Sequence, residues 1–140
     1  MNKLQIPLLI ALSSIFFAGG ILAQNQPLAC QVDVSAGLKW ESGQWKTANF
    51  TERKFILVQR GDTLTKESVA QALQLGNAIS YVTCSTDSEK LISCLGFGTR
   101  TLIFDPATNR GGTSFLSGTA NGNNVRRDTP FIEAFTCQQY

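Results

Sequence analysis

The positions of the four cysteines constrain the fold of this 140-residue chain more than any other feature. In an exported chain, an even number of cysteines indicates two disulfides, for which three connectivities exist. Cys84 and Cys94 lie symmetrically about Glu89, in a stretch where two β-branched, apolar runs flank the polar residues 85–90. A hairpin folded there places the two cysteines opposite each other, at about the 5.5 Å Cα separation that a disulfide needs. This geometry favours Cys84–Cys94, which leaves Cys30 to pair with Cys137.

The first 23 residues have the layout of a cleaved signal peptide. Lys3 supplies a positive charge, residues 8–20 are mostly apolar, and Ala23 is the small residue that a signal peptidase requires. We expect cleavage near Ala23, a periplasmic or secreted product, and a single disulfide-stabilised β domain over residues 24–140. That length is sufficient for one hydrophobic core.

Two alternative readings of the N-terminus are less favoured. An uncleaved membrane anchor would need a longer apolar run than residues 6–23, which contain Pro7 and two glycines. A lipoprotein signal would place a leucine three residues before Cys30, where this chain has Pro27. We therefore expect no stable membrane anchor.

Short strands and turns dominate the rest of the chain. Alternating or apolar residues bounded by glycine, proline, aspartate and asparagine predict seven or eight strands. The clearest strands are residues 30–36, 54–59, 101–104, 113–116 and 130–137. In residues 30–36, Val32 and Val34 are expected on one face, whereas the apolar run 54–59 suits a strand that is covered on both faces or crosses a closed barrel. One short helix is expected at about residues 66–75, with Thr65 as N-cap and Gly76 as C-cap residue.

The predicted fold is mainly β. Consecutive hairpins favour a single antiparallel meander, which closes into a small barrel or a two-sheet sandwich. The pattern alone does not choose between these two architectures.

A tight turn at Ser42–Gly43 sets Trp40 opposite Trp45. Two interpretations of this pair remain open. The tryptophans cap one end of the core, or they form an exposed aromatic pair that stacks on a sugar ring or inserts into a partner's pocket.

A second candidate binding region is the glycine- and asparagine-rich segment 120–128, which the composition predicts to be an exposed loop. Asn123, Arg126 and Arg127 are its candidate contact residues, because recognition residues are often carried by loops on a rigid scaffold.

The composition excludes several chemistries. The chain has no histidine, which rules out Ser-His-Asp and Cys-His nucleophilic sites, and no C-x-x-C motif that would favour zinc. Loss of Lys3 lowers the formal net charge from +2 to +1, so no electrostatic footprint for nucleic acid exists. A pair of carboxylates remains conceivable for a glycosidase, but most carboxylates lie beside turns. We expect no enzyme activity, no cofactor and no metal site.

Glu133 interrupts an otherwise apolar strand, on the same face as Phe131 and Phe135. If that face is inward, the carboxylate needs an arginine partner, for which Arg100 and Arg110 are candidates. The favoured interpretation is instead a residue at the edge of the core that reaches solvent.

Several structural features occur together in the chain. They are Cys30, the Trp40-x4-Trp45 turn, Phe50, Phe55-Ile56-Leu57, the F-D-P-A-T segment at 104–108 and Phe135-Thr136-Cys137. This combination resembles small exported proteobacterial proteins of unassigned function. A looser analogy, from size and architecture, is to the periplasmic inhibitors of c-type lysozyme, whose inhibitory-loop motif this chain lacks.

The leading functional hypothesis is an exported, non-enzymatic binding or interaction module of the bacterial envelope. Its partner would be an envelope protein or a foreign protein. The alternatives are an inhibitor of a lysozyme-like or other hydrolase, a small β-barrel carrying an apolar ligand, and, least favoured, a carboxylate-based hydrolase.

Overall fold

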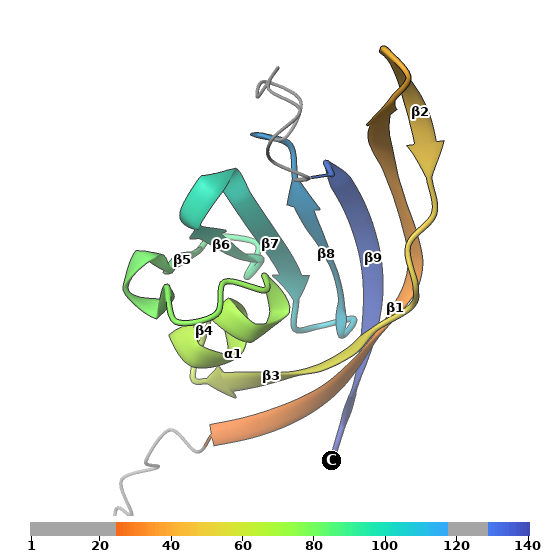
Figure 1. Cartoon of the computed structure of the whole chain (residues 1–140). Coiled ribbons are helices and arrows are strands. Elements are labelled where there is room, and N and C mark those ends of the chain that lie inside the picture. Colours follow the sequence, from red (N-terminus) through yellow and green to blue (C-terminus); the bar gives the residue numbers. More distant parts are fainter. Residues whose placement is uncertain (1–24, 118–128) are drawn as a thin grey trace, which may run out of the picture.

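The computed structural model describes residues 25–117 and 129–140, which form one antiparallel sheet and three short helices (Figure 1). The strands are β1 (Asn25–Glu41), β2 (Gln44–Ala48), β3 (Lys54–Arg60), β4 (Thr63–Leu64), β5 (Thr83–Thr86), β6 (Ile92–Gly96), β7 (Arg100–Asp105), β8 (Arg110–Phe115) and β9 (Phe131–Gln139). The helices are α1 (Lys66–Ala72) and the 3-10 turns η1 (Ile79–Tyr81) and η2 (Phe97–Thr99).

The sheet is an up-and-down meander that nearly closes into a barrel. Its strand order is β4-β3-β1-β9-β8-β7-β6-β5, with β2 paired to β1. The pairing of β9 with β1 joins the two ends of the described domain, and α1 packs on β3 beside the remaining opening (Figure 1). The predicted mainly-β fold with one short α-helix is confirmed, in its barrel form.

Residues 25–60 form one long hairpin about the Ser42–Gly43 turn. Both turn residues have positive φ, 54° and 78°, as a two-residue type I′ turn requires. The register from Glu41↔Gln44 to Asn25↔Arg60 is unchanged, although β2 and β3 are separated by residues 49–53. Pairing with β9 stops at Gly37, so the tip of the hairpin extends beyond the rest of the sheet (Figure 1).

A β-bulge corrects the alternation expected in residues 30–36. The β1–β9 register shifts between Val32 and Val34, which leaves Asp33 as the extra residue. Val32 is therefore fully buried against Phe135, whereas Val34 lies on the outer face and is 61% exposed. Of the two alternatives for residues 54–59, a strand covered on both faces is wrong, because Ile56 is exposed, whereas a strand of a barrel describes β3.

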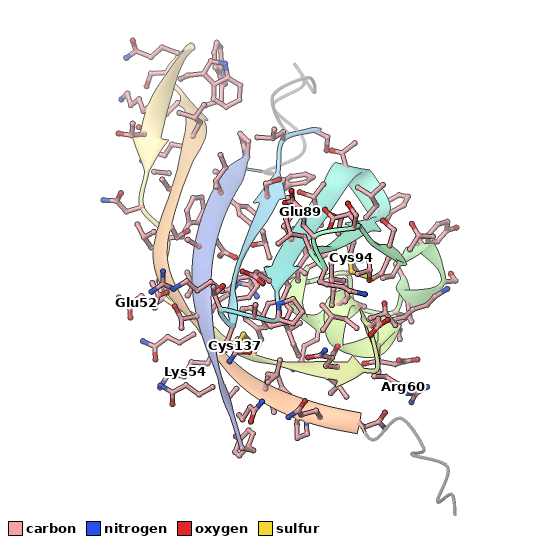
Figure 2. The ribbon with its side chains drawn as sticks, turned by 180° about the vertical axis from the view of Figure 1, so that it is seen from behind. Glu52, Lys54, Arg60, Glu89, Cys94 and Cys137 are labelled. Atoms are coloured by element: carbon pink, nitrogen blue, oxygen red, sulfur yellow. A yellow bond between two sulfur atoms is a disulfide. The ribbon has the colours of Figure 1, made fainter. Side chains whose placement is uncertain are left out.

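Both predicted disulfides are present. Cys84–Cys94 and Cys30–Cys137 each join directly opposite residues of neighbouring strands, with Cα atoms 4.1 and 4.0 Å apart. Cys94 and Cys137 lie in different parts of the barrel (Figure 2). Two such bonds indicate a protein that folds outside the reducing cytoplasm.

Helix α1 is shorter than expected. It begins after Thr65 as predicted but ends at Ala72, because Gln74 already has a positive φ of 55°. Its buried face adds Val69, Ala72 and the following Leu73 to the core. No helix within residues 25–117 and 129–140 is long and apolar enough to span a membrane.

A glycine allows two core aromatics to stack. Gly111 lies on the inner face of β8, between Phe104 on β7 and Phe135 on β9. The two rings are nearly parallel, with centroids 6.4 Å apart. A Cβ on Gly111 would overlap both the Ile103 carbonyl oxygen and the Phe135 ring.

We expect Gly111→Ala to lower the free energy of unfolding by about 1–3 kcal/mol, because the core must shift to admit the methyl group. Urea unfolding of the oxidised protein measures this change. Ser93→Ala, on the exposed face of β6, is the control and should stay within about 0.5 kcal/mol of the parent. Equal midpoints for the two variants would contradict the packing argument.

Candidate functional site

The tip of the long hairpin exposes two tryptophans. Trp40 and Trp45 pair edge to face, with ring centroids 5.2 Å apart and an interplanar angle of 70°. They remain 50% and 42% exposed, so the pair does not cap the core. Of the two interpretations drawn from the sequence, the exposed aromatic pair describes its geometry. We call residues 38–48 the tryptophan hairpin.

The opposite face of the tryptophan hairpin is charged. Because side chains alternate along a strand, Lys39, Glu41 and Lys46 point away from the tryptophans. The Glu41 Oε2 lies 3.1 Å from Lys46 Nζ and 3.5 Å from Lys39 Nζ. The hydrogen bond from Lys46, with the nearby charge of Lys39, holds the pKa of Glu41 below its usual value. The carboxylate separates two lysines that face each other across the strands.

The aromatic face continues onto the outer surface of the barrel. Val34, Ala36, Leu38 and Trp40 share one side of β1 after the bulge. Two rows of outward-facing residues then cross the sheet from β1 to β5, and neither row contains a charged side chain. They are Val34, Ala134, Gly112, Ile103, Ser93 and Ser85, and Ala36, Ile132, Ser114, Thr101, Leu95 and Thr83. Within these rows Val34, Ile103, Ile132 and Leu95 are large apolar side chains that are more than half exposed.

A buried ion pair lies inside the barrel. The Glu133 side chain is 5% exposed, and its oxygens accept hydrogen bonds from Arg53 Nε, at 3.1 Å each, and from Thr113 Oγ1, at 2.7 Å. A second nitrogen of the Arg53 guanidinium also donates to Glu133 and, over 2.7 Å, to the Ala72 carbonyl. This last bond ties the end of α1 to the sheet.

The ion pair corrects two expectations. Glu133 does not reach solvent, and its partner is neither Arg100 nor Arg110. Arg100 instead places its guanidinium over the Phe115 ring, 4.2 Å from the centroid. Arg53 lies 80 residues from Glu133 in the sequence, in the irregular segment before β3, so no local pattern pointed to it.

A small cavity of about 310 Å³ opens beside this pair. Aromatic and polar side chains line it, namely Phe50, Thr51, Arg53, Gln74, Arg100, Phe115, Thr129, Phe131 and Glu133. Below it the barrel is filled by the side chains of Phe104, Phe135 and their neighbours. The interior of the barrel, as formed by residues 25–117 and 129–140, is therefore a packed core.

The remaining candidate residues from the sequence divide into two groups. The four cysteines form the two disulfides, whereas Asn123, Arg126 and Arg127 lie outside the described residues. Across residues 25–117 and 129–140, no group of three or more cysteine, aspartate or glutamate residues could hold a metal ion. No protein-family model, curated protein or solved structure matches the chain.

Proposed function

We propose that this protein is an exported, non-enzymatic binding module of the bacterial envelope that engages a partner protein through the tryptophan hairpin. The observation that carries this proposal is the exposed Trp40–Trp45 pair at the tip of an arm that extends beyond the barrel. Tryptophan is enriched among the residues that dominate binding energy at protein interfaces.

The hairpin is suited to binding because its conformation is held before contact. The type I′ turn, five cross-strand residue pairs and the Glu41 ion pairs fix the backbone. Little conformational entropy would then be lost when a partner covers the tryptophans. The uncharged outer rows beside β1 would extend the contact beyond the tip.

Two features support the proposed compartment. The disulfides require an oxidising environment, and residues 1–23 have the layout of a signal peptide. We propose the periplasm or the extracellular medium as the site of action.

A second candidate function is inhibition of a lysozyme-like or other hydrolase. The narrow, two-stranded arm favours it, because such an arm can enter an active-site cleft. The packed core is the observation that weighs against the third expectation, a barrel carrying an apolar ligand.

Affinity capture on the immobilised, oxidised mature domain tests the proposal. Envelope extract and c-type lysozyme are passed over the domain, and bound species are identified by mass spectrometry. A stoichiometric partner is expected, and Trp40→Ala or Trp45→Ala should weaken its binding at least about tenfold. Both variants should stay folded, because the pair contributes only about 0.5–1.5 kcal/mol beyond burial.

Tyr81→Ala, exposed on η1 and outside both the tryptophan hairpin and the uncharged outer rows, is the matched control and should bind within about twofold of the parent. A partner that binds all three variants equally would contradict a role for the hairpin. Inhibition of lysozyme turnover at a one-to-one ratio would select the inhibitor.

A further inference from the structure

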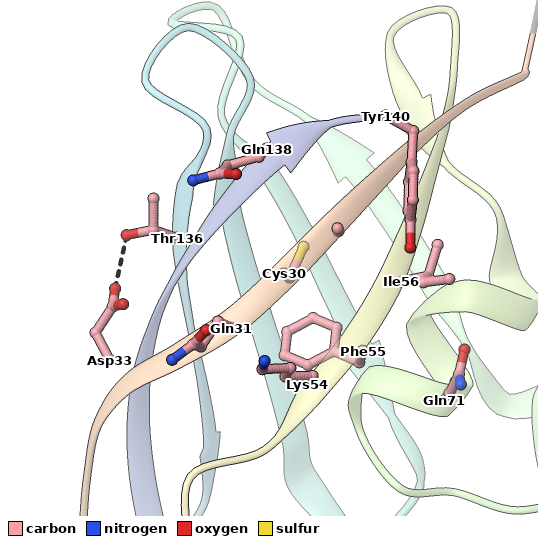
Figure 3. Close-up of a pocket in the computed structure, with 11 residues that line it drawn as sticks. Cys30, Gln31, Asp33, Lys54, Phe55, Ile56, Gln71, Thr136, Gln138 and Tyr140 are labelled. Atoms are coloured by element: carbon pink, nitrogen blue, oxygen red, sulfur yellow. Dashed lines mark hydrogen bonds between the residues drawn. The ribbon is translucent and has the colours of Figure 1, made fainter.

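A second, polar hollow lies on the outer face of the barrel, away from the tryptophan hairpin. It crosses β9, β1 and β3 and reaches Gln71 on α1 (Figure 3). Its volume is about 740 Å³, within the range of small-ligand sites. The outward-facing residues that line it are Ala29, Gln31, Asp33, Lys54, Ile56, Gln71, Thr136, Gln138 and Tyr140. We call it the outer groove.

The groove exists because a small residue lies between larger ones. Ala29, in the middle strand β1, is opposite Gln138 on β9 and Ile56 on β3. In the next row Gln31 is opposite Thr136 and Lys54. The short Ala29 side chain therefore leaves a depression surrounded by long side chains.

The polar groups of the groove are largely available to a ligand. Within the described part of the chain, the amides of Gln31, Gln71 and Gln138 and the ammonium of Lys54 have no hydrogen-bond or ion-pair partner. Asp33 accepts one bond, from Thr136 Oγ1 at 2.6 Å, and keeps further acceptor capacity. Among the lining side chains there is one carboxylate, Asp33, and one ammonium, Lys54, so their formal charges cancel.

The backbone of β1, the middle strand of the groove floor, offers nothing to a ligand. Strand β1 pairs with β3 on one side and with β9 on the other over residues 28–31. An extended peptide cannot add to the sheet here, because both edges of this strand are occupied. On this strand, recognition must depend on side chains.

We propose that the outer groove binds an uncharged glycan. Sugar hydroxyls both donate and accept hydrogen bonds, which matches amide groups that offer both functions. The exposed Tyr140 ring beside Ile56 supplies an apolar surface for the C–H face of a sugar (Figure 3). This site is separate from the tryptophan hairpin, so it goes beyond the protein-binding function proposed above.

The test uses three neutral hexasaccharides, maltohexaose, cellohexaose and chitohexaose, titrated into the ¹⁵N-labelled mature domain. We expect at least one to shift the amide resonances of Ala29, Gln31 and Gln138, with a millimolar or lower dissociation constant. Ala29→Trp fills the groove without removing a polar group and should abolish these shifts. Ala134→Trp places the same side chain on an exposed position of β9 outside the groove and should bind as the parent does.

A second variant guards against a folding defect in Ala29→Trp. Gln31→Ala/Gln138→Ala removes two amides and should weaken binding at least tenfold. Absence of shifts with all three sugars at 10 mM (about the weakest binding the titration resolves) would overturn the proposal. Shifts that survive both groove variants, or that disappear in Trp40→Ala, would also overturn it, because the sugar would then bind elsewhere.

Discussion

Replacing Arg53 with methionine is expected to lower the free energy of unfolding by about 3–5 kcal/mol, because the Glu133 carboxylate then stays buried without its counter-charge. Methionine keeps most of the packing volume beside Phe55, over whose ring the guanidinium lies. The hydrogen bond to the Ala72 carbonyl is lost as well, so the end of α1 should loosen. Urea unfolding with the disulfides intact measures the loss, and amide exchange reports on α1.

The companion variants separate the ion pair from simple packing. In Arg53→Met/Glu133→Met, neither charge is buried, so the double variant should recover much of the lost stability. Lys54→Met, on the outer face one residue away, is the control and should change stability by less than about 0.5 kcal/mol. Additive losses in the double variant, or a loss below about 1 kcal/mol for Arg53→Met, would show that the pair is not the source.

Removing the Cys30–Cys137 bond is expected to cost more stability than removing Cys84–Cys94. The bonds close loops with sequence separations of 107 and 10 residues. In the chain-entropy model these loops correspond to about 5 and about 3 kcal/mol, because the longer loop restricts the unfolded chain more. Paired replacements, Cys30→Ala/Cys137→Ala and Cys84→Ala/Cys94→Ala, avoid leaving a free thiol in either variant.

Denaturant midpoints and slopes of the two paired variants decide the matter. The larger shift should belong to Cys30→Ala/Cys137→Ala. Equal shifts at equal slopes would mean that strain or residual structure in the unfolded state, and not loop length, determines the contribution of each bond.

Local symmetry explains which features of the fold were predictable. The cysteine hairpin and the Ser42–Gly43 turn each depend on residues within about ten positions of one another, where the spacing itself states the register. Once Cys84 was assigned to Cys94, Cys30 could pair only with Cys137. In the structure this bond joins β1 to β9, a strand pairing that the sequence did not predict.

Features that depend on how strands far apart in the sequence align with each other were not predictable. The bulge at Asp33 turns the Val34 side chain to the outer face, and nothing in the sequence of residues 30–36 indicates the extra residue. Arg53 meets Glu133 only because residues 49–53 link β2 to β3 beside β1, where the Arg53 carbonyl accepts a hydrogen bond from Val32 N. The outer groove combines side chains from β9, β1, β3 and α1, so its polar cluster exists only after folding.

The pairing of β1 with β9 has a consequence for the order of folding. When the chain emerges with its N-terminus first, β1 appears before the other strands. Strand β9, which pairs with β1, appears last. Strands β5 to β8 can each pair with the preceding strand as soon as they leave the export machinery. The Cys84–Cys94 disulfide can form between β5 and β6 at that stage. Cys84 and Cys94 emerge before Cys137, so the Cys30 thiol must not react with either of them before Cys137 is available. Closure of this barrel is therefore a late step in folding. Before β9 pairs with β1, the chain is most exposed to non-native disulfides and to proteases.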